Sequence, residues 1–259
     1  KHTQNWVYRN TTLVLRIGLK RMEQKVLHTN DKKGWLGMGK RIIVISGFSG
    51  VGKGTMVRHL LELNRSMPMR AKLWLSVSDT TRSPRKDGGD NYNFISSEEY
   101  NNRIASGYYL EHNKYGNHGY GTPVKPVLAA LEHGNTVVLE IDYYGMVQVR
   151  DYFRDSDVSV TTIFICTEGN ELFGRLHKRG DSPIEIKKRL SAACSEASHV
   201  DEFDCLIDNC VLEDAVNLLW LIATGKTDSK RNTFDSLRFI DQVQSILKVF
   251  DSVSSAEGA

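Results

Sequence analysis

The chain has 259 residues, of which 40% are hydrophobic and 25% charged, a balance typical of a globular protein with a core of ordinary size. No stretch approaches the roughly 18 apolar residues that a membrane-spanning helix needs, so we expect no membrane association. The net charge of +3 is uneven, because residues 1–37 carry eight basic and two acidic groups, a net of +6, which leaves −3 for residues 38–259. This mildly acidic main part argues against a nucleic-acid-binding protein.

The four cysteines form no C-x-x-C pair, and no histidine lies at zinc-like spacing beside them. They are Cys166, Cys194, Cys205 and Cys210. We therefore expect reduced thiols, no metal ion held by the protein alone, and a cytoplasmic location. The N-terminus lacks an apolar core followed by small residues, which argues against a signal peptide.

Short β-rich runs alternate with amphipathic segments from Met38 onward. In chain order we expect a strand at 42–46, a helix at 55–63, a strand at 73–78, helices at 97–105 and 124–132, a strand at 136–141, a helix at 144–153, a strand at 160–165, helices at 170–179 and 183–197, a strand at 205–207 and a helix at 212–222. Ser97 is the expected N-cap of its helix. Strands alternating with helices predict a parallel α/β sheet.

Two terminal regions fall outside this alternation. Residues 1–37 show weak periodicity, and we interpret them as a basic arm that precedes a functional domain at 38–225. Residues 226–259 form a C-terminal extension with apolar residues at helical spacing, which predicts an amphipathic helix. These apolar residues are Phe234, Leu237, Ile240, Val243, Leu247 and Phe250. The helix would pack on the domain or bind a partner.

The phosphate-binding signal is the run Gly47–Thr55, whose sequence Gly-Phe-Ser-Gly-Val-Gly-Lys-Gly-Thr fits the pattern G-x-x-x-x-G-K. It follows an apolar strand and precedes an amphipathic helix, the context that a phosphate-binding loop requires. Glycines let the backbone curl and present several N–H groups to one phosphate, while the helix points its positive end at the same anion. Lys53 supplies a mobile positive charge for the transferring oxygens. The alternative is a glycine-rich turn without a ligand.

A second candidate for anion binding follows at residues 76–85, Ser-Val-Ser-Asp-Thr-Thr-Arg-Ser-Pro-Arg. Arg82 and Arg85 lie three residues apart with a rigid proline between them, and planar guanidinium donors meet phosphate oxygens in pairs. Tyr92 can donate its phenol to the same phosphate. The spacing indicates a fork for a monophosphate, and the alternative is a solvated basic loop.

The pattern S-x-S-x-T-T-R-x-P-R behind this phosphate loop resembles the guanylate kinase family. Further segments match the family in the same order. They are Leu110-Glu111, Gly116–Thr122, the acidic strand end Val138–Asp142, Arg175–Gly180, Lys188–Leu190 and Ile207–Asn209. The resemblance spans about residues 40–222. It implies a P-loop NTPase-type fold, with a parallel sheet flanked by helices, an inserted GMP-binding α+β region at 76–125 and a small helical lid at 170–190.

The resemblance also implies which residues bind GMP. The phosphate would be held by Ser78, Arg82, Arg85, Tyr92 and Tyr120. Glu111 would accept hydrogen bonds from the N1–H and 2-amino group of guanine, and adenine has no donor at N1. Thr122 and Ser78 would contact the base edge, and Asp142, with Glu140 nearby, would lie near the ribose or a Mg²⁺-bound water.

On the ATP side, the resemblance implies binding by Gly47, Ser49, Gly50, Val51, Gly52, Lys53, Gly54, Thr55 and Asn209, with Asn209 at the adenosine. Arg175, Arg179 and Arg189 would close over the ATP phosphates and act in catalysis together with Lys53 and Arg82. The commoner loop has a hydroxyl directly after the lysine, whereas Gly54 stands here. The Mg²⁺ that accompanies ATP is therefore expected to be held mainly by phosphates and water.

The implied activity is direct transfer of the γ-phosphoryl group of ATP to GMP. One alternative is a related P-loop kinase with another phosphorylated acceptor, and Glu111 with Ser78 and Thr122 argues against it. A second is a non-catalytic guanylate-kinase-like binding module, and the intact Gly47–Thr55 loop and the lid arginines argue against it.

The sequence departs from the family in the loop between Arg85 and Tyr92, which is about two residues shorter. Asp79 and Gly174 are positions to which the pattern assigns no role.

Overall fold

The computed structural model describes residues 39–67, 71–84, 91–227 and 234–256, which belong to one compact unit, Gly39–Ala259. The expected basic arm at 1–37 and the start of the domain at Met38 lie outside these residues, as does Arg85. The basic arm, the start of the domain and the role of Arg85 therefore stay predictions.

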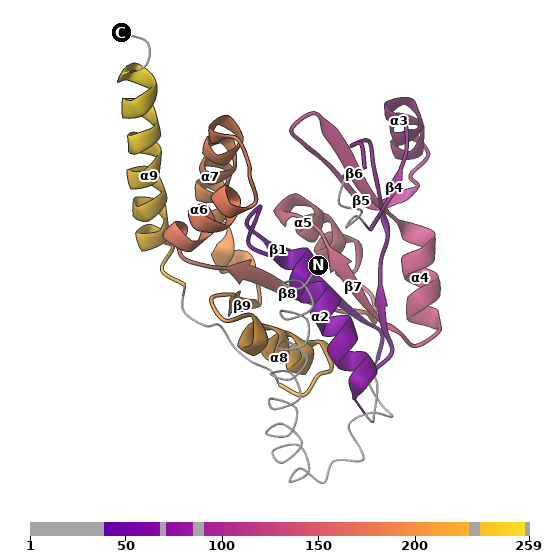
Figure 1. Ribbon diagram of the computed structural model, residues 1–259. Helices are drawn as coiled ribbons and strands as arrows, with labels where there is room; N and C mark the ends of the chain where they lie inside the picture. Colours follow the sequence, from indigo (N-terminus) through magenta and orange to yellow (C-terminus); the bar gives the residue numbers. More distant parts are fainter. Residues whose placement is uncertain (1–38, 68–70, 85–90, 228–233, 257–259) are drawn as a thin grey trace, which may run out of the picture. The chain divides into compact units, whose positions relative to one another are not determined.

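The main sheet has five strands in the order β2-β7-β1-β8-β9, and all of them pair in parallel (Figure 1). The strands are β1 (Arg41–Gly47), β2 (Leu73–Leu75), β7 (Thr136–Glu140), β8 (Ser159–Cys166) and β9 (Cys205–Asp208). The central β1 pairs Ile43 with Val138 on one side and with Thr161 on the other. Continuous apolar runs such as 42–45 are fully buried, because helices cover both faces of a parallel sheet. The predicted parallel α/β architecture is confirmed.

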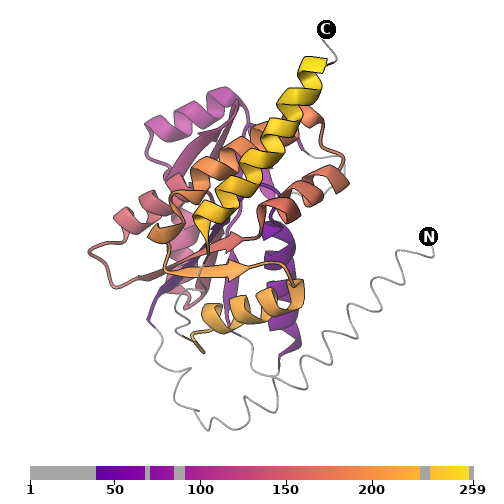
Figure 2. The ribbon, with the colours of Figure 1, turned by 90° about the vertical axis from the view of Figure 1, so that its left-hand side faces the viewer.

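Helices flank this sheet close to the predicted positions. They are α2 (Lys53–Ser66), α4 (Val124–Glu132), α5 (Tyr143–Tyr152) and α8 (Leu212–Ala223). Helix α2 packs side by side with α8, and α5 packs against β1 and β8 (Figures 1 and 2). Helix α2 follows directly from β1, so the turn that joins them lies at the carboxyl edge of the central strand. This edge is where open α/β sheets bind ligands.

A second sheet of four strands, in the order β4-β3-β6-β5, forms the region predicted as an insertion. Its strands are β3 (Ser78–Thr80), β4 (Tyr92–Phe94), β5 (Tyr109–Tyr115) and β6 (His118–Pro123), and α3 (Ser97–Ala105) accompanies them. The predicted strand at 73–78 is wrong in one respect, because β2 ends at Leu75 and β3 begins in the other sheet. Ser78, Asp79 and Thr80 are buried polar residues that pair with β4 and β6 rather than entering the apolar core.

The N-terminus of α3 also corrects the sequence prediction. The capping hydroxyl belongs to Ser96, whose Oγ accepts a hydrogen bond from the backbone N–H of Glu99 at 3.0 Å, and Ser97 is the first helical residue. Because adjacent serines can both cap, the sequence pattern locates the helix start only to within one residue.

Asp79, to which the sequence assigned no role, is the centre of the second sheet. Its side chain is fully buried and accepts hydrogen bonds from Arg103 at 2.5 Å, Tyr109 at 2.9 Å and Asn93 at 3.0 Å. These donors come from α3, β5 and β4, so one carboxylate joins four elements. Hydrogen bonds to an ionised acceptor are stronger than neutral ones. The carboxylate therefore fixes the strand that carries Ser78.

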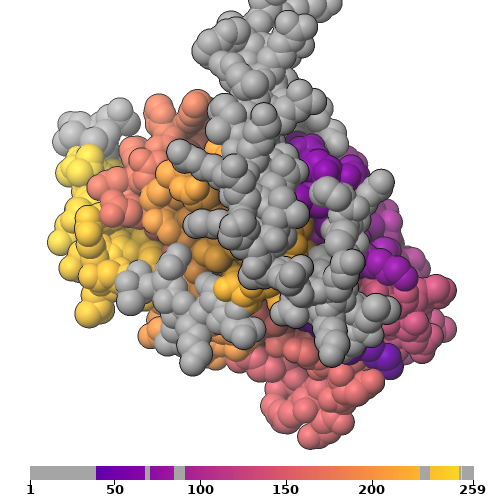
Figure 3. Space-filling view, turned by 90° about the horizontal axis from the view of Figure 1, so that it is seen from below, coloured from indigo at the N-terminus to yellow at the C-terminus, as the bar shows by residue number. Residues whose placement is uncertain are grey.

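Three further α-helices and one short 3₁₀ helix, η1 (Val200–Glu202), complete the helices of the described residues. Helices α6 (Gly169–Lys178) and α7 (Pro183–Ala197) occupy the predicted lid, and Ser182 and Glu185 form a capping box at the start of α7. Helix α9 (Ser236–Ala256) packs along both of them. Figure 3 shows atoms of the C-terminal segment, in yellow, adjoining orange atoms of the preceding helices. Of the helices that the structure describes, none combines the length and the apolar composition needed to cross a membrane.

We predict that Asp79→Ala lowers the free energy of unfolding by about 2–4 kcal/mol, because three donors lose a buried acceptor. Urea-induced unfolding measures this. The matched control is Glu99→Gln, which changes the exposed partner of the same Arg103 and should cost at most about 1 kcal/mol. Equal losses in the two variants would contradict the role assigned to the buried carboxylate.

Candidate functional site

The phosphate loop Gly47–Thr55 joins the end of β1 to the start of α2 in the conformation that its glycines allow. Gly50 and Gly52 have φ angles of 95° and 101°, in the left-handed region that favours glycine. A Cβ atom on Gly50 would lie 2.5 Å from Cδ2 of Leu176 in α6. The lid helix thus packs directly on the loop, and any side chain at Gly50 would force the two apart.

Lys53 lies across this loop. Its ammonium donates hydrogen bonds to the backbone carbonyls of Gly47 at 2.6 Å and Phe48 at 3.2 Å. Lys53 is also the first residue of α2, so its charge lies beside the positive end of the helix dipole. The arrangement of a curled backbone, a helix N-terminus and an ammonium group can bind a polyphosphate.

Arg175 and Asn209 hold the middle of the loop. The backbone carbonyl of Val51 accepts hydrogen bonds from Arg175 at 2.8 Å and from the side-chain amide of Asn209 at 2.8 Å. Arg175 also donates to the backbone carbonyl of Asn209 at 2.5 Å. Oδ1 of Asn209 is buried and has no hydrogen-bond partner among the described residues, so it offers an acceptor beside the loop. In this structure Arg175 supports the loop, and its predicted closure over ATP phosphates stays a prediction.

The other two lid arginines meet at Asp181, a residue that the sequence analysis did not select. Arg179 forms an ion pair with Asp181, and Nε of Arg189 lies 3.1 Å from the same carboxylate. Arg189 also donates a hydrogen bond to the Ser49 hydroxyl at 2.5 Å. Arg189, like Arg175, therefore contacts the phosphate loop directly, and Asp181 aligns Arg189 with Arg179.

A chain of three buried side chains forms the predicted base pocket. The Ser78 and Thr122 hydroxyls are 2.8 Å apart, and Thr122 donates to Oε1 of Glu111 at 2.5 Å. Glu111 is 4% exposed. Burial raises the pKa of its carboxyl from 4.5 to about 7, the nearby Asp142 adds to the rise, and the Thr122 hydrogen bond opposes it. The pocket thus holds a carboxyl group that changes charge near neutral pH.

Helix α5 leaves room for this carboxyl group. A Cβ atom at Gly145 would lie 2.6 Å from Oε2 of Glu111, so only glycine permits the close approach. Asp142 caps the same helix, with Oδ1 accepting from the Gly145 N–H at 2.8 Å and Oδ2 accepting from Asn113 at 2.6 Å. Asp142 therefore lies beside the Glu111 carboxyl, and its implied place near the ribose or a Mg²⁺-bound water stays a prediction.

Aromatic rings surround the predicted phosphate fork. The Tyr92 and Tyr120 ring centroids are 5.7 Å apart, and the Arg82 guanidinium lies 5.8 Å from the Tyr92 centroid. Tyr100 donates to the backbone carbonyl of Tyr120 at 3.1 Å, which fixes the strand on which Tyr120 lies. The structure brings these three predicted ligands together, while Arg85, the second prong of the fork, lies outside the described residues.

Glu196 of α7 links the two halves of the site and was missed in the sequence. Burial raises the pKa of its carboxyl to about 7, with the charge of Lys53 opposing the rise and that of Asp142 adding to it. Its Oε2 atom is buried without a hydrogen-bond partner in the described part of the chain. The contacts agree with this, because Glu140 at the end of β7 lies against Gly54 of the loop, and Asp142, two residues later, caps the helix whose Gly145 touches Glu111. The phosphate loop and base pocket therefore lie in one neighbourhood.

Tyr115 makes a second link that no pattern in the sequence suggested. It ends β5, and its phenol lies within electrostatic reach of Glu196 and Arg189 of α7. Burial raises the pKa of this phenol above its ordinary value. A Cβ atom on the next residue, Gly116, would lie 3.6 Å from Nζ of Lys188 in the lid. The turn after β5 therefore lies against the lid, and the lid reaches the phosphate loop through Arg189 and Ser49.

The residues near the loop fit a Mg²⁺ ion that arrives with a nucleotide. Within the described residues, no group of three or more His, Cys, Asp or Glu side chains is arranged to hold a metal ion. Glu140 ends β7, and its carboxylate oxygens lie 3.7 and 3.8 Å from the position of a Cβ atom on Gly54, next to Thr55. Mg²⁺ favours such sites, where one carboxylate and water complete a coordination shell begun by phosphates.

Comparison with known proteins agrees with this geometry. The family model described as guanylate kinase matches residues 39–222. The chain is similar to guanylate kinases from Streptomyces kasugaensis, 40% identical over 67% of this chain and 82% of the relative, and Clostridium tetani, 37% identical over 71% and 86%. Among solved structures, the guanylate kinase from Anaplasma phagocytophilum aligns with a TM-score of 0.58 at 27% identity, covering 73% of this chain and 86% of that one.

The raised pKa of Glu111 predicts a pH-dependent stability. The folded state holds this proton more tightly than the unfolded state, so its stabilising contribution is complete below pH 4.5 and is lost as pH rises through about 7. Glu111→Gln should remove that loss, and its unfolding free energy relative to wild type should rise by about 3 kcal/mol between pH 4.5 and 8.

Urea unfolding of both proteins across this range measures the difference. Glu196→Gln, measured alongside, separates the contribution of the other carboxyl whose pKa is raised to about 7. Parallel pH curves for wild type and Glu111→Gln would refute the assigned pKa.

Proposed function

Because the chain belongs to the guanylate kinase family, we propose that it transfers the γ-phosphoryl group of ATP to GMP, giving ADP and GDP. The observation that carries this proposal is the meeting of two unlike sites. A glycine-lined loop with Lys53 suits a triphosphate, and a buried carboxyl group with two hydroxyls suits guanine. Glu140, beside Gly54 of the loop, and Asp142, which caps the helix turn against Glu111, are two residues apart, so donor and acceptor would lie close enough for direct transfer.

The acceptor site would select guanine through Glu111. An ionised carboxylate accepts two hydrogen bonds from the N1–H and 2-amino group, and Thr122 already fixes its orientation. Adenine presents an unprotonated N1, which would leave a buried carboxylate unpaired. Arg82, Tyr92 and Tyr120, joined by Arg85, would hold the GMP phosphate.

The donor site would bind ATP with the phosphates in the Gly47–Thr55 loop and the adenosine near Asn209. Mg²⁺ would be held by the phosphates and water, with Glu140 and Thr55 able to hold coordinated water, and it would neutralise phosphate charge. Arg175, Arg179 and Arg189 would turn toward the transferring phosphoryl group, which Lys53 also contacts.

Transfer would occur in line and without a covalent enzyme intermediate. The GMP phosphate is already anionic, so the reaction needs no protein base, and positioning and electrostatic stabilisation supply the catalysis. The P–O bond to ADP breaks as the GMP oxygen bonds to the same phosphorus. Closure of 76–125 and 170–190 around the nucleotides would exclude water and suppress ATP hydrolysis.

The proposed catalytic domain is 38–225, with 1–37 and 226–259 outside the reacting centre. All four cysteines are free thiols in the structure, which supports a cytoplasmic location.

We predict that Lys53→Ala and Arg82→Ala each lower kcat/KM with GMP by about 10³-fold or more, since each removes a charge that contacts a phosphate. A coupled assay for ADP release measures this, with circular dichroism to verify folding. The control Lys40→Ala removes an exposed lysine that pairs with Asp157 and should keep wild-type activity. Near-normal rates in either active-site variant would argue against the proposed function.

The acceptor prediction concerns Glu111→Gln. We expect its kcat/KM with GMP to fall by about 10²-fold or more, because the neutral amide accepts one of the two guanine hydrogen bonds poorly. The kcat/KM with AMP should fall far less, so the ratio of kcat/KM for GMP to that for AMP should decrease. A panel of GMP, dGMP, AMP, UMP and CMP tests this with wild type and variant. Unchanged discrimination in the variant would place base recognition elsewhere, and a wild type that prefers another acceptor would favour the related-kinase alternative.

A further inference from the structure

Helix α9 lies outside residues 39–222, which the family model covers, yet it contacts both donor-side elements of the proposed site. Its sequence showed only apolar residues at helical spacing, which left its role open between packing and partner binding. The structure buries Phe239 and Val243, at 2% and 0% exposure, against the rest of the unit. The inner face of α9 is therefore occupied by this chain itself.

The first contact reaches the phosphate loop. The Phe239 ring stacks on that of Phe48, with centroids 4.4 Å apart and planes 4° from parallel. Phe48 is the second residue of the loop and is fully buried, and it meets Phe164 of β8 edge-on at 4.9 Å. The ring centroid of Phe234, just before α9, lies 6.0 Å from that of Phe48 and 5.5 Å from that of Phe239. The back of the phosphate loop is thus packed between the central sheet and α9.

The second contact reaches the first lid helix. The side-chain oxygen of Gln242 accepts a hydrogen bond at 2.8 Å from the N–H of Gly169, the first residue of α6. A Cβ atom on Gly169 would lie 3.0 Å from both Cβ of Gln242 and Cγ2 of Val243, so the two helices approach as closely as glycine permits. Further along, the Phe250 and Phe173 rings meet edge-on at 6.0 Å.

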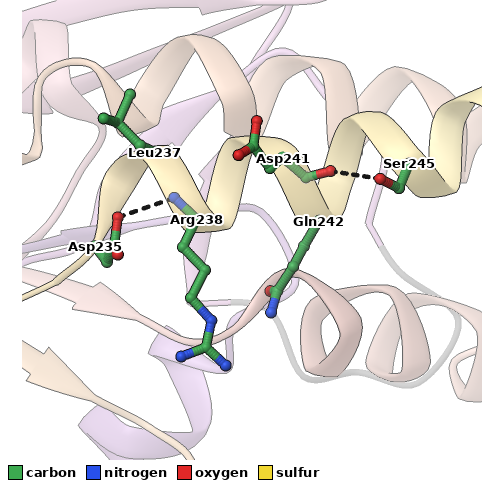
Figure 4. A pocket seen from close by; sticks show the side chains of 6 residues that line it. All are labelled: Asp235, Leu237, Arg238, Asp241, Gln242 and Ser245. Atoms are coloured by element: carbon green, nitrogen blue, oxygen red, sulfur yellow. Dashed lines mark hydrogen bonds between the residues drawn. The ribbon is translucent and has the colours of Figure 1, made fainter.

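The outer face of α9 differs from this inner one. Figure 4 shows Arg238 and Gln242 extending from one side of the helix and Leu237 from the other. Asp235 caps the helix by accepting from the Arg238 N–H at 2.9 Å, and a shallow surface pocket here is lined by Asp235, Leu237, Arg238, Asp241, Gln242 and Ser245. Leu237 is 76% exposed. It therefore offers a control site on the same helix.

We propose that α9 is a positioning helix that joins the phosphate loop to the lid, with Phe239 and Gln242 as its positioning residues. Arg175 and Arg189 already reach from the lid to the loop, through the Val51 carbonyl and the Ser49 hydroxyl. Helix α9 holds the outer side of the same two elements, so the lid arginines keep their place relative to the bound triphosphate. This inference rests on the proposed ATP-binding role of the loop and lid.

The test compares the full-length chain with Phe239→Ala, Gln242→Ala and the control Leu237→Ala. Loosening the lid relative to the loop should raise KM for ATP about tenfold or more in the first two variants, because small misplacements of charged groups weaken phosphate contacts strongly. KM for GMP should stay close to the wild-type value, since no α9 contact described above involves the acceptor pocket. Leu237→Ala should match wild type in both constants.

A purely structural role predicts a different pattern. Partial unfolding would lower the apparent kcat, because fewer molecules are active, and would leave KM for ATP unchanged. This result would overturn the proposal. Equal KM and kcat values in Phe239→Ala and Leu237→Ala would overturn it as well. Circular dichroism verifies folding, and if Phe239→Ala does not fold, Gln242→Ala decides, because it leaves the ring stack in place.

Calorimetric titration with a non-hydrolysable ATP analogue separates this proposal from the proposed function. A wild type that binds the analogue but does not phosphorylate GMP would refute the acceptor assignment alone, and weaker binding in Gln242→Ala would still support the role of α9. Unchanged analogue affinity in both α9 variants would refute the positioning role alone.

Discussion

The site depends on one backbone turn, the phosphate loop between β1 and α2. Its left-handed glycines curl the chain at the carboxyl edge of the central strand, and several of the predicted ATP-side residues contact this turn. The lid packs on Gly50, Arg175 and Asn209 hold the Val51 carbonyl, and Arg189 reaches Ser49. A loop of this shape would not persist alone, because its polar backbone groups need these partners.

Desolvation determines the protonation of the buried carboxyl group on the acceptor side, as backbone geometry determines the shape of the phosphate loop on the donor side. Glu111 is buried against α5 with one hydroxyl donor, so its charged form is destabilised until a ligand supplies further donors. Guanine carries two such donors side by side. Under the proposed function, the free-energy cost of burying the carboxyl would become selectivity, because a matching base would supply the missing donors.

The sequence predicted the main sheet and most helices because buried parallel strands and amphipathic helices have strong periodic patterns. It did not resolve 73–78, where the chain passes from one sheet to another, since that change depends on which strands pair with Ser78–Thr80. The local motif around Arg82 and the resemblance supplied the predicted acceptor residues, which stay predictions, and the structure brings Arg82, Tyr92 and Tyr120 together. Glu196 and Tyr115 had no such signal, because the charges that act on them come from segments far apart in the chain. Asp181 is close in sequence to Arg179 and Arg189, but no motif marks an aspartate at this position.

Lys53 is bound to weak acceptors that a nucleotide would replace. It donates to two backbone carbonyls, which are neutral groups, whereas Arg189 is shared between the Ser49 hydroxyl and the Asp181 carboxylate. Triphosphate oxygens carry full charge and form stronger hydrogen bonds with ammonium and guanidinium groups. Exchange of acceptors at Lys53 would therefore favour the proposed nucleotide binding with a side-chain movement alone. The backbone that holds Lys53 and Arg189 is already braced by the sheet on one side and by the lid and α9 on the other.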